Sequence, residues 1–453
     1  MKVVVLGAGE VGRHIAARLS REKAEVTLVD RDQARLDQAA ESMDIQVIAG
    51  PGADPAILSA AGLTEADLLV AVTSSDETNI LACRLAQLLA PPETRRLARI
   101  RSSGFFDFFD EKRFRDDFGI NFIINPSVEA AETILDLIEF PGATDIITVA
   151  KGRLRLAGLR LPRHHPLLNT PLAQLRPEVR QDVLIAAIHR RHQLVIPRGD
   201  TVLRAGDLVY VASGADDAHK VRAFYGLSQE PVRHITIVGG GELGYHLARR
   251  LAADQRDFKV KLIERDGGRC EYLSARLPST MIIKGDGTDH DLLLDENAGE
   301  TDAFIAVSTD DEKNLISCLV AKRLGARQTI TRVNRSSYAP LVASIGLGAM
   351  VSARVAAAGA VLKYLRRGRV ISVATLTSED AEIIEFQVPP QSRAAGRKLL
   401  EIKFPEGALV TALTRGEEVS IPRGSTGIEA GDILAVVART EAIGAVEKLL
   451  SAR

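Results

Sequence analysis

Short runs of Val, Ile and Leu recur along the first 125 residues, and stretches with helical spacing of apolar positions separate them. The runs are VVVLG (3–7), EVTLVD (25–30), IQVIAG (45–50), DLLVAVT (67–73), RLARIR (96–101) and INFIIN (120–125). Strands that are apolar on both faces and alternate with helices are typical of a parallel sheet covered on both sides. The pattern therefore predicts a doubly wound, Rossmann-like domain.

The whole pattern occurs twice. VAVTSSDETNILACRLA (70–86) aligns with IAVSTDDEKNLISCLVA (305–321) at an offset of 235 residues. A second kind of unit also recurs, because VIPRGDTVLRAGDLVYVA (195–212) aligns with SIPRGSTGIEAGDILAVVA (420–438). In this smaller unit, Gly and Pro turn signals bracket short alternating strands, which predicts antiparallel pairing, and in the first copy one helix near 215–225 closes the unit.

We therefore predict an α/β protein with two tandem doubly wound Rossmann-like parallel-sheet domains, each followed by a small α+β domain. The expected boundaries are 1–140 for the first nucleotide-binding domain, 141–228 for the first small domain, 232–368 for the second nucleotide-binding domain and 369–453 for the second small domain. GLSQEP (226–231) is the expected linker between the halves.

Each large domain opens with a strand, a glycine-rich loop and a helix. The glycines are Gly7, Gly9 and Gly12 in the first half and Gly239, Gly241 and Gly244 in the second. In such loops the first glycine permits a tight turn, the second lets the backbone approach a pyrophosphate, and the third allows close packing of helix on strand. Asp30 and Glu264 end the next strand, where a carboxylate accepts hydrogen bonds from a ribose diol and repels a 2′-phosphate. This favours NAD or another adenine nucleotide over NADP.

The helix after the fourth strand opens with TSSDETN (73–79) in one half and STDDEKN (308–314) in the other. Ser74 with Glu77, and Thr309 with Glu312, have the spacing of a capping box, so we expect them to cap these helices. We also expect Thr73, Ser74, Ser308 and Thr309 to face the nucleotide, because ligands bind at the carboxyl ends of strands near the switch point of the sheet.

Two further positions bear on the site. Arg99 and Arg332 occupy matching places on the fifth strand, where a guanidinium could reach phosphate; the alternative is a surface salt bridge. After the third strand the halves differ, since Asp286 offers a carboxylate to a ribose or a cation where Pro51 cannot. We therefore expect the two sites to differ in ligand preference.

Composition narrows the class of protein. Lys plus Arg (58) nearly balance Asp plus Glu (59), so no overall positive field favours nucleic acid. Apolar runs are strand-length, the three cysteines are isolated, and no leader pattern precedes the first strand, so we expect a cytoplasmic protein without a metal site. The seven phenylalanines of the Phe-rich span 105–122 could simply fill core, but they have more aromatic area than one helix needs, which suggests a subunit contact or a contact between the halves.

Two classes of function remain. An NAD-dependent oxidoreductase needs a general acid or base beside the nicotinamide, and the sequence offers no suitable pair next to either loop, so we expect no catalytic residue. A binding module with two nucleotide sites fits a sensor whose domains rearrange with the ligand.

The chain resembles the TrkA family of cytosolic regulatory subunits of bacterial Trk potassium uptake systems, whose tandem units are called RCK domains. The motifs that carry the resemblance are GAGEVG, LVD, AVTSSDETN, ARIR, IEFPGA (138–143), VGGGELG, KLIERD and AVSTDDEKN. The resemblance implies binding of NAD or NADH, or of ATP or ADP. It also implies a homo-oligomeric ring, such as a tetramer, docked on the cytoplasmic face of a Trk-type potassium channel membrane subunit. A regulator of another cation transporter, such as a potassium efflux antiporter, is the alternative.

By position, the resemblance carries the family's nucleotide contacts onto both halves of this chain, although Pro51 departs from the acid often found there. The implied and predicted contacts are Gly7, Ala8, Gly9, Glu10, Val11, Gly12, Asp30, Thr73, Ser74 and Arg99 in the first half, and Gly239, Gly240, Gly241, Glu242, Leu243, Gly244, Glu264, Asp286, Ser308, Thr309 and Arg332 in the second.

Overall fold

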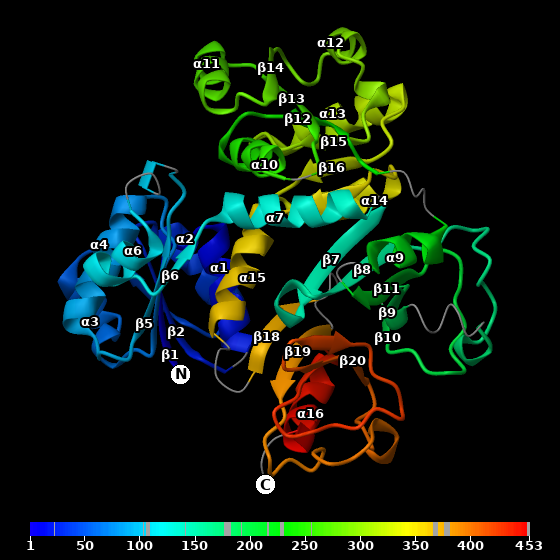
Figure 1. Cartoon of the computed structure of the whole chain (residues 1–453). Helices are drawn as coiled ribbons and strands as arrows, with labels where there is room; N and C mark the ends of the chain where they lie inside the picture. The colour runs from blue at the N-terminus through cyan, green and yellow to red at the C-terminus, as the bar shows by residue number, and fades with distance from the viewer. Residues whose placement is uncertain are drawn as a thin grey trace. The chain divides into compact units, whose positions relative to one another are not determined.

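Figure 1 shows the helices and strands of the computed structural model. The chain divides into two compact units. The described residues are 1–453 without 22, 103, 106–108, 141, 176–182, 192, 215–216, 227–230, 255, 366–369, 376–380 and 451–453. The first unit comprises 1–132 with 241–247 and 352–364, and the second comprises 133–240, 248–351 and 365–453. The expected linker at 226–231 falls mostly outside the described residues.

The first unit is built on a six-stranded parallel sheet in the order β3-β2-β1-β4-β5-β6. All four residues of β4 are buried, as its uninterrupted apolar sequence predicts. The strand order reverses between β1 and β4, so the predicted doubly wound fold is confirmed. The strands are β1 (Lys2–Leu6), β2 (Glu25–Asp30), β3 (Gln46–Ala49), β4 (Leu68–Ala71), β5 (Arg95–Arg99) and β6 (Phe122–Ile124), and the helices are α1 (Glu10–Arg21), α2 (Gln33–Ser42), α3 (Pro55–Ala60), α4 (Asp76–Leu89) and α6 (Glu111–Phe118). Helix α7 (Pro126–Glu139) follows, and its residues up to 132 belong to this unit.

The second half of the chain repeats this sheet in the order β14-β13-β12-β15-β16-β17. Cys83 on α4 and Cys318 on α13 are buried at matching places, and burial raises the pKa of each thiol to about 12. The strands are β12 (His234–Val238), β13 (Lys259–Glu264), β14 (Thr280–Lys284), β15 (Ala303–Ala306), β16 (Thr329–Arg332) and β17 (Ala349–Val351), and the helices are α10 (Glu242–Ala252), α11 (Gly267–Arg276), α12 (His290–Asp295), α13 (Asp311–Leu324), α14 (Ala339–Ser344) and α15 (Ala353–Leu365).

Each small domain is an antiparallel five-stranded sheet with one helix after its last described strand, as predicted. The first sheet has the order β10-β9-β11-β8-β7 and the second β18-β19-β22-β20-β21. The first comprises β7 (Ala143–Val149), β8 (Leu154–Arg160), β9 (Leu184–Arg190), β10 (Gln193–Val195), β11 (Leu208–Gly214) and α9 (Ala218–Tyr225). The second comprises β18 (Val370–Thr375), β19 (Ala381–Gln387), β20 (Ala408–Arg415), β21 (Glu418–Ser420), β22 (Ile433–Arg439) and α16 (Ile443–Leu450).

The two small sheets share one hydrophobic core within the second unit. Leu156 and Tyr210 of the first sheet pack in the same cluster of buried residues as Ile383 and Val437 of the second. The backbone amide of Ala150 also donates to a carboxylate oxygen of the buried Glu385 over 2.6 Å. The two repeats of the small domain therefore form one packed body.

The Phe-rich span serves mainly the core of the first unit. Phe114 is fully buried, and the Phe109 ring centroid lies 5.8 Å from that of Phe114 and 5.3 Å from that of Phe118. Phe122 stacks on Tyr364 of α15 with centroids 4.7 Å apart, so this residue makes the expected contact between the halves. Two other members of the span, Phe106 and Phe108, lie outside the described residues.

Candidate functional site

The glycines of the first loop differ in how closely the protein packs around them. Gly7 has φ +104°, and a Cβ there would lie 3.0 Å from the backbone of Thr73. A Cβ on Gly12 would lie 1.8 Å from the carbonyl oxygen of Gly7. A Cβ on Gly9 would have no atom within 4 Å. Gly7 and Gly12 are therefore required for packing, and Gly9 leaves the backbone open to a ligand.

The loop of the second half repeats this division. Gly239 has φ +105°, and a Cβ there would lie 2.7 Å from the backbone nitrogen of Ser308. Gly241, like Gly9, faces open space. A Cβ on Gly240 would lie 2.5 Å from Leu273, so this glycine is needed where the first half has Ala8.

The strand-terminal acids support these loops. Asp30 accepts hydrogen bonds from the backbone amides of Ala8 (2.5 Å) and Asp32 (2.9 Å). Glu264 accepts from the amides of Gly240 (2.7 Å) and Asp266 (2.8 Å). A carboxylate accepts about four hydrogen bonds, so each acid retains acceptor capacity for a ribose hydroxyl.

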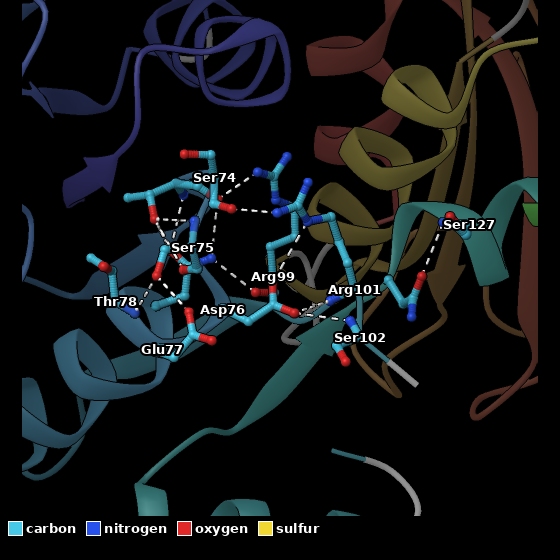
Figure 2. Close-up of polar contacts among 12 residues, drawn as sticks. Ser74, Ser75, Asp76, Glu77, Thr78, Arg99, Arg101, Ser102 and Ser127 are labelled. Atoms are coloured by element: carbon cyan, nitrogen blue, oxygen red, sulfur yellow. Dashed lines mark hydrogen bonds and ion pairs between the residues drawn. The ribbon is translucent and has the colours of Figure 1, made fainter. Parts of the chain in front are cut away.

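The guanidinium groups of the arginines on the fifth strands are desolvated. The Arg99 guanidinium donates to the carbonyl oxygen of Thr73, and burial lowers the pKa of Arg99 to about 10 (Figure 2). Burial also lowers the pKa of Arg332. The Nε atoms of both are buried without a hydrogen-bond partner, and neither side chain forms an ion pair within the described ranges. The interpretation as surface salt bridges is therefore wrong, and both cations are suited to an anionic ligand.

A fully buried asparagine, to which the sequence analysis gave no role, holds each site together. Asn79 accepts from the amide (2.9 Å) and hydroxyl (2.8 Å) of Thr73 and donates to the carbonyls of Thr73 (3.2 Å) and Arg99 (2.9 Å). Asn314 likewise accepts from the amide of Ser308 and donates to the carbonyls of Ser308 and Arg332. The asparagine links the loop after the fourth strand to the end of the fifth. Its recurrence at matching positions of both repeats was the sequence signal that could have indicated this role.

Asp76 and Asp311 fix the chain just beyond the fifth strand. Asp76 is buried and accepts from the amides of Arg101 and Ser102, both at 2.9 Å (Figure 2). Asp311 is also buried and accepts from the two equivalent amides of the second half, those of Asn334 and Arg335. These aspartates also recur in both repeats.

The helix caps lie one residue further along than expected. Ser75 caps α4 by accepting from the amide of Thr78 over 3.0 Å, and Asp310 caps α13 by accepting from the amide of Lys313. The prediction of Ser74 and Thr309 as caps is wrong. Asn79 and Asn314 bond to Thr73 and Ser308, two residues beyond the end of the fourth strand, so these residues belong to the loop that precedes each helix.

The other predicted contacts differ in whether their side chains are bonded within the protein, exposed or buried. The hydroxyl of Thr73 is used by Asn79, and the hydroxyl of Ser308 donates to the carbonyl of Asp310. The side chains of Ser74 and Thr309 are exposed. Among the loop residues, Val11 and Leu243 are buried, and Glu10 and Glu242 are the first residues of α1 and α10.

Comparison with known proteins shows the family. The TrkA-N domain matches residues 3–126 and 235–353, and the TrkA-C domain matches residues 156–226 and 383–451. The chain is 35% identical to the Trk system potassium uptake protein TrkA of Halomonas elongata, over 99% of this chain and 98% of that one. It is 34% identical to the TrkA homolog 1 of Methanosarcina mazei, over 99% of both chains. The chain belongs to the TrkA family.

Solved structures agree with this TrkA fold. The crystal structure of the GsuK RCK domain superposes with a TM-score of 0.61 at 19% sequence identity, covering 100% of this chain and 95% of that one. The GsuK channel bound to NAD gives 0.61 at 18% identity, covering 100% of this chain and 79% of that one. At these identities the likeness concerns the fold.

The two sites of this TrkA chain differ after the third strand. Asp286 accepts from the amide (3.0 Å) and hydroxyl (2.8 Å) of Thr288 and forms an ion pair with Lys313 at 3.1 Å. The hydrogen bonds from Thr288 and the charge of Lys313 lower the pKa of Asp286 to about 2. The first half has Pro51 and Thr78 at the corresponding positions, so it lacks this pair.

Neither a metal-binding cluster nor a membrane-spanning helix occurs in the described part of the chain. No group of three or more His, Cys, Asp or Glu side chains there is arranged to hold a metal ion. Within the same residues, no helix is long and apolar enough to cross a membrane.

Proposed function

We propose that this TrkA-family chain is the nucleotide-sensing regulatory subunit of a Trk-type potassium uptake system. The observation that carries the proposal is the pair of desolvated arginines, Arg99 and Arg332, each beside a glycine loop that is open at Gly9 or Gly241. A desolvated cation that forms no ion pair is stabilised when an anion binds. The choice of a Trk-type potassium uptake system rests on the relatives named Trk system potassium uptake protein.

The ligand we propose is an adenine nucleotide, either NAD or NADH, or ATP or ADP. The backbone at Gly9 and at Gly241 would hold the phosphates on one side of the switch point, and Arg99 and Arg332 would hold them on the other. Asp30 and Glu264 would accept ribose hydroxyls. The ligand would supply a charged bridge between strand ends, and Asn79 and Asn314 hold the strand ends that this bridge would join.

We propose sensing and not catalysis as the use of these sites. A ligand that joins two parts of the crevice shifts a conformational equilibrium if its affinity differs between two arrangements. A few kcal/mol of differential affinity moves such an equilibrium over a useful range, roughly what one or two charged hydrogen bonds supply. Incubation with NADH and candidate carbonyl substrates tests this point, and steady turnover would contradict it.

We further propose that copies of the chain assemble with one another and with a membrane subunit on the cytoplasmic face of the membrane. The outer faces of α4 and α13 expose large apolar side chains, which are half-exposed or more at Leu81 and Leu88 on α4 and about half-exposed at Ile316 on α13. Apolar side chains gathered on one helix face mark a protein contact. In the ring expected from the family resemblance, these faces would lie between copies.

Reconstituted potassium flux tests the proposal as a whole. The chain is combined with a Trk-type membrane subunit in vesicles, and flux is measured with and without ATP or NADH. The double variant Gly9→Val/Gly241→Val is expected to dock but lose the nucleotide dependence. A docked double variant that still responds fully to nucleotide would overturn the sensing role of the glycine loops.

A further inference from the structure

The two candidate sites carry a second cation on different elements. In the first half it is Arg101, two residues beyond Arg99, and the matching residue of the second half is the neutral Asn334. In the second half it is Lys313, in the first turn of α13, and the matching residue of the first half is the neutral Thr78. Beside the shared arginine, each half therefore has a further cation at a position where the other half has a neutral residue.

The two second cations are held differently. The guanidinium of Arg101 donates to the carbonyl oxygen of Ser74 and lies 3.7 Å from a carboxylate oxygen of Asp76 (Figure 2). Asp76 is buried and also binds two backbone amides, so Arg101 belongs to the framework of its site. The ammonium of Lys313 is held by Asp286, and the side chains of this pair are 40% and 38% exposed.

Asp286 belongs to a turn that covers the end of the central strand. A Cβ on Gly287 would lie 2.2 Å from Val238, the last residue of β12. The glycine loop starts at the next residue, Gly239, which lies against the backbone of Ser308. The pair between Asp286 and Lys313 therefore spans two segments that border the glycine loop.

The two carboxylate oxygens of Asp286 have different partners, Thr288 for one and Lys313 for the other. Its Oδ1 accepts both hydrogen bonds from Thr288, and its Oδ2 is the atom paired with Lys313. A ribose hydroxyl that donates to Oδ2 competes directly with the ammonium. The released lysine has a flexible four-carbon chain and a compact charge that binds phosphate.

We propose that Lys313 is the phosphate-selecting residue of the second site, held by Asp286 until a nucleotide displaces it. This inference rests on the nucleotide-binding function proposed above. The terminal phosphate of a nucleoside triphosphate carries more negative charge than the diester phosphates of a dinucleotide. The second site therefore prefers nucleoside triphosphates to NADH more strongly than the first site does.

Calorimetry on the full chain carrying Gly9→Val isolates the second site and tests this preference. Lys313→Thr installs the residue that the first half uses, and it is expected to weaken ATP binding about tenfold while changing NADH binding less than about twofold. Arg323→Thr removes the same charge from the last turn of α13 and is the matched control. It should leave both affinities unchanged. Equal effects of Lys313→Thr on the two nucleotides would overturn the inference.

A second variant tests the holding role of Asp286. Asp286→Asn releases Lys313, so ATP binding is expected to become a few-fold tighter in the same background. Unchanged or weaker ATP binding would contradict the holding role. If the Gly9→Val chain binds neither nucleotide, the proposed second site fails together with this inference. If it binds both with a ratio insensitive to residue 313, the proposed function stands and only the inference is wrong.

Discussion

The side-chain amide of Asn79 donates a hydrogen bond to the backbone carbonyl of Arg99 over 2.9 Å, which joins the first helix turn after β4 to the end of β5. Asn79 is fully buried, and it also bonds to Thr73, two residues beyond the end of β4. One amide group therefore links the loop after β4 to the end of β5.

Asn79→Ala is expected to lower the free energy of unfolding by about 3 kcal/mol, because several buried backbone groups lose their partner. Urea unfolding followed by circular dichroism measures the loss. Gln33→Ala, at an exposed position of α2, is the control and should change stability by less than about 0.5 kcal/mol. A loss below about 1 kcal/mol for Asn79→Ala would show that water replaces the amide.

The glycines of the first loop should separate binding from folding. Gly9→Val is expected to remain folded, because the added side chain meets open space, and to weaken ADP and NADH binding at the first site more than about tenfold. Gly12→Val is expected to destabilise the protein severely, because its Cβ would overlap the carbonyl of Gly7. Calorimetry and thermal unfolding measure the two effects. Unaltered nucleotide affinity in folded Gly9→Val would argue against a phosphate at this loop.

Arg99→Gln and Arg332→Gln should reduce nucleotide affinity without a loss of stability. Each guanidinium is desolvated and forms no ion pair among the described residues, so its removal relieves a cost in the free protein and removes the proposed phosphate contact in the complex. We expect affinity to fall about tenfold to a hundredfold, with the unfolding free energy unchanged or higher. Arg323→Gln is the control for a change of surface charge. A marked loss of stability with unchanged binding would assign the arginines a structural role.

Acid should weaken the second nucleotide domain through Asp286. Its pKa is lowered in the folded protein to about 2, below the ordinary value near 4. A depressed carboxyl pKa contributes stability that is fully present above the unfolded value and is lost as the pH falls from about 4 to about 2. Asp286→Asn is therefore expected to flatten the acid dependence of the denaturation midpoint in this range. An identical slope in the variant and the parent chain would contradict the assignment.

The exposed faces of α4 and α13 predict the assembly contacts. Leu81→Lys/Leu88→Lys and Ile316→Lys are expected to lower the oligomeric state measured by light scattering at micromolar concentration, because each places a charge on an apolar contact. Leu400→Lys is the control, since Leu400 is 67% exposed in the second small domain. A stable monomer in the parent chain, or an unchanged oligomer in both variants, would count against these faces.

The sequence predicted the features that depend on local patterns. The six apolar runs became the six strands of the first sheet, and the roles of Gly7 and Gly12 follow from their place between a strand and a helix. Glycine loops and buried parallel strands can be predicted from sequence because glycine permits tight turns and apolar runs form buried strands.

Other features depend on contacts that no local pattern specifies. The shared core of the two small sheets joins segments more than 200 residues apart, for example Leu156 and Ile383, and short alternating strands do not indicate their partner. The desolvation of the Arg332 guanidinium depends on the side chains folded around it. The position of the helix caps depends on the bonds that Asn79 and Asn314 make to Thr73 and Ser308, six residues before each asparagine.

The covalent joining of two similar halves removes a constraint that acts on symmetric dimers. In a symmetric dimer of identical chains, a substitution that alters one site alters its mate in the same way. In this chain, Pro51 and Asp286 were free to become different while the shared core of the small sheets kept its two contributors together. Substitutions can therefore change the two candidate sites of this chain independently. Because both sites belong to one polypeptide, they are always present in a one-to-one ratio at any cellular concentration.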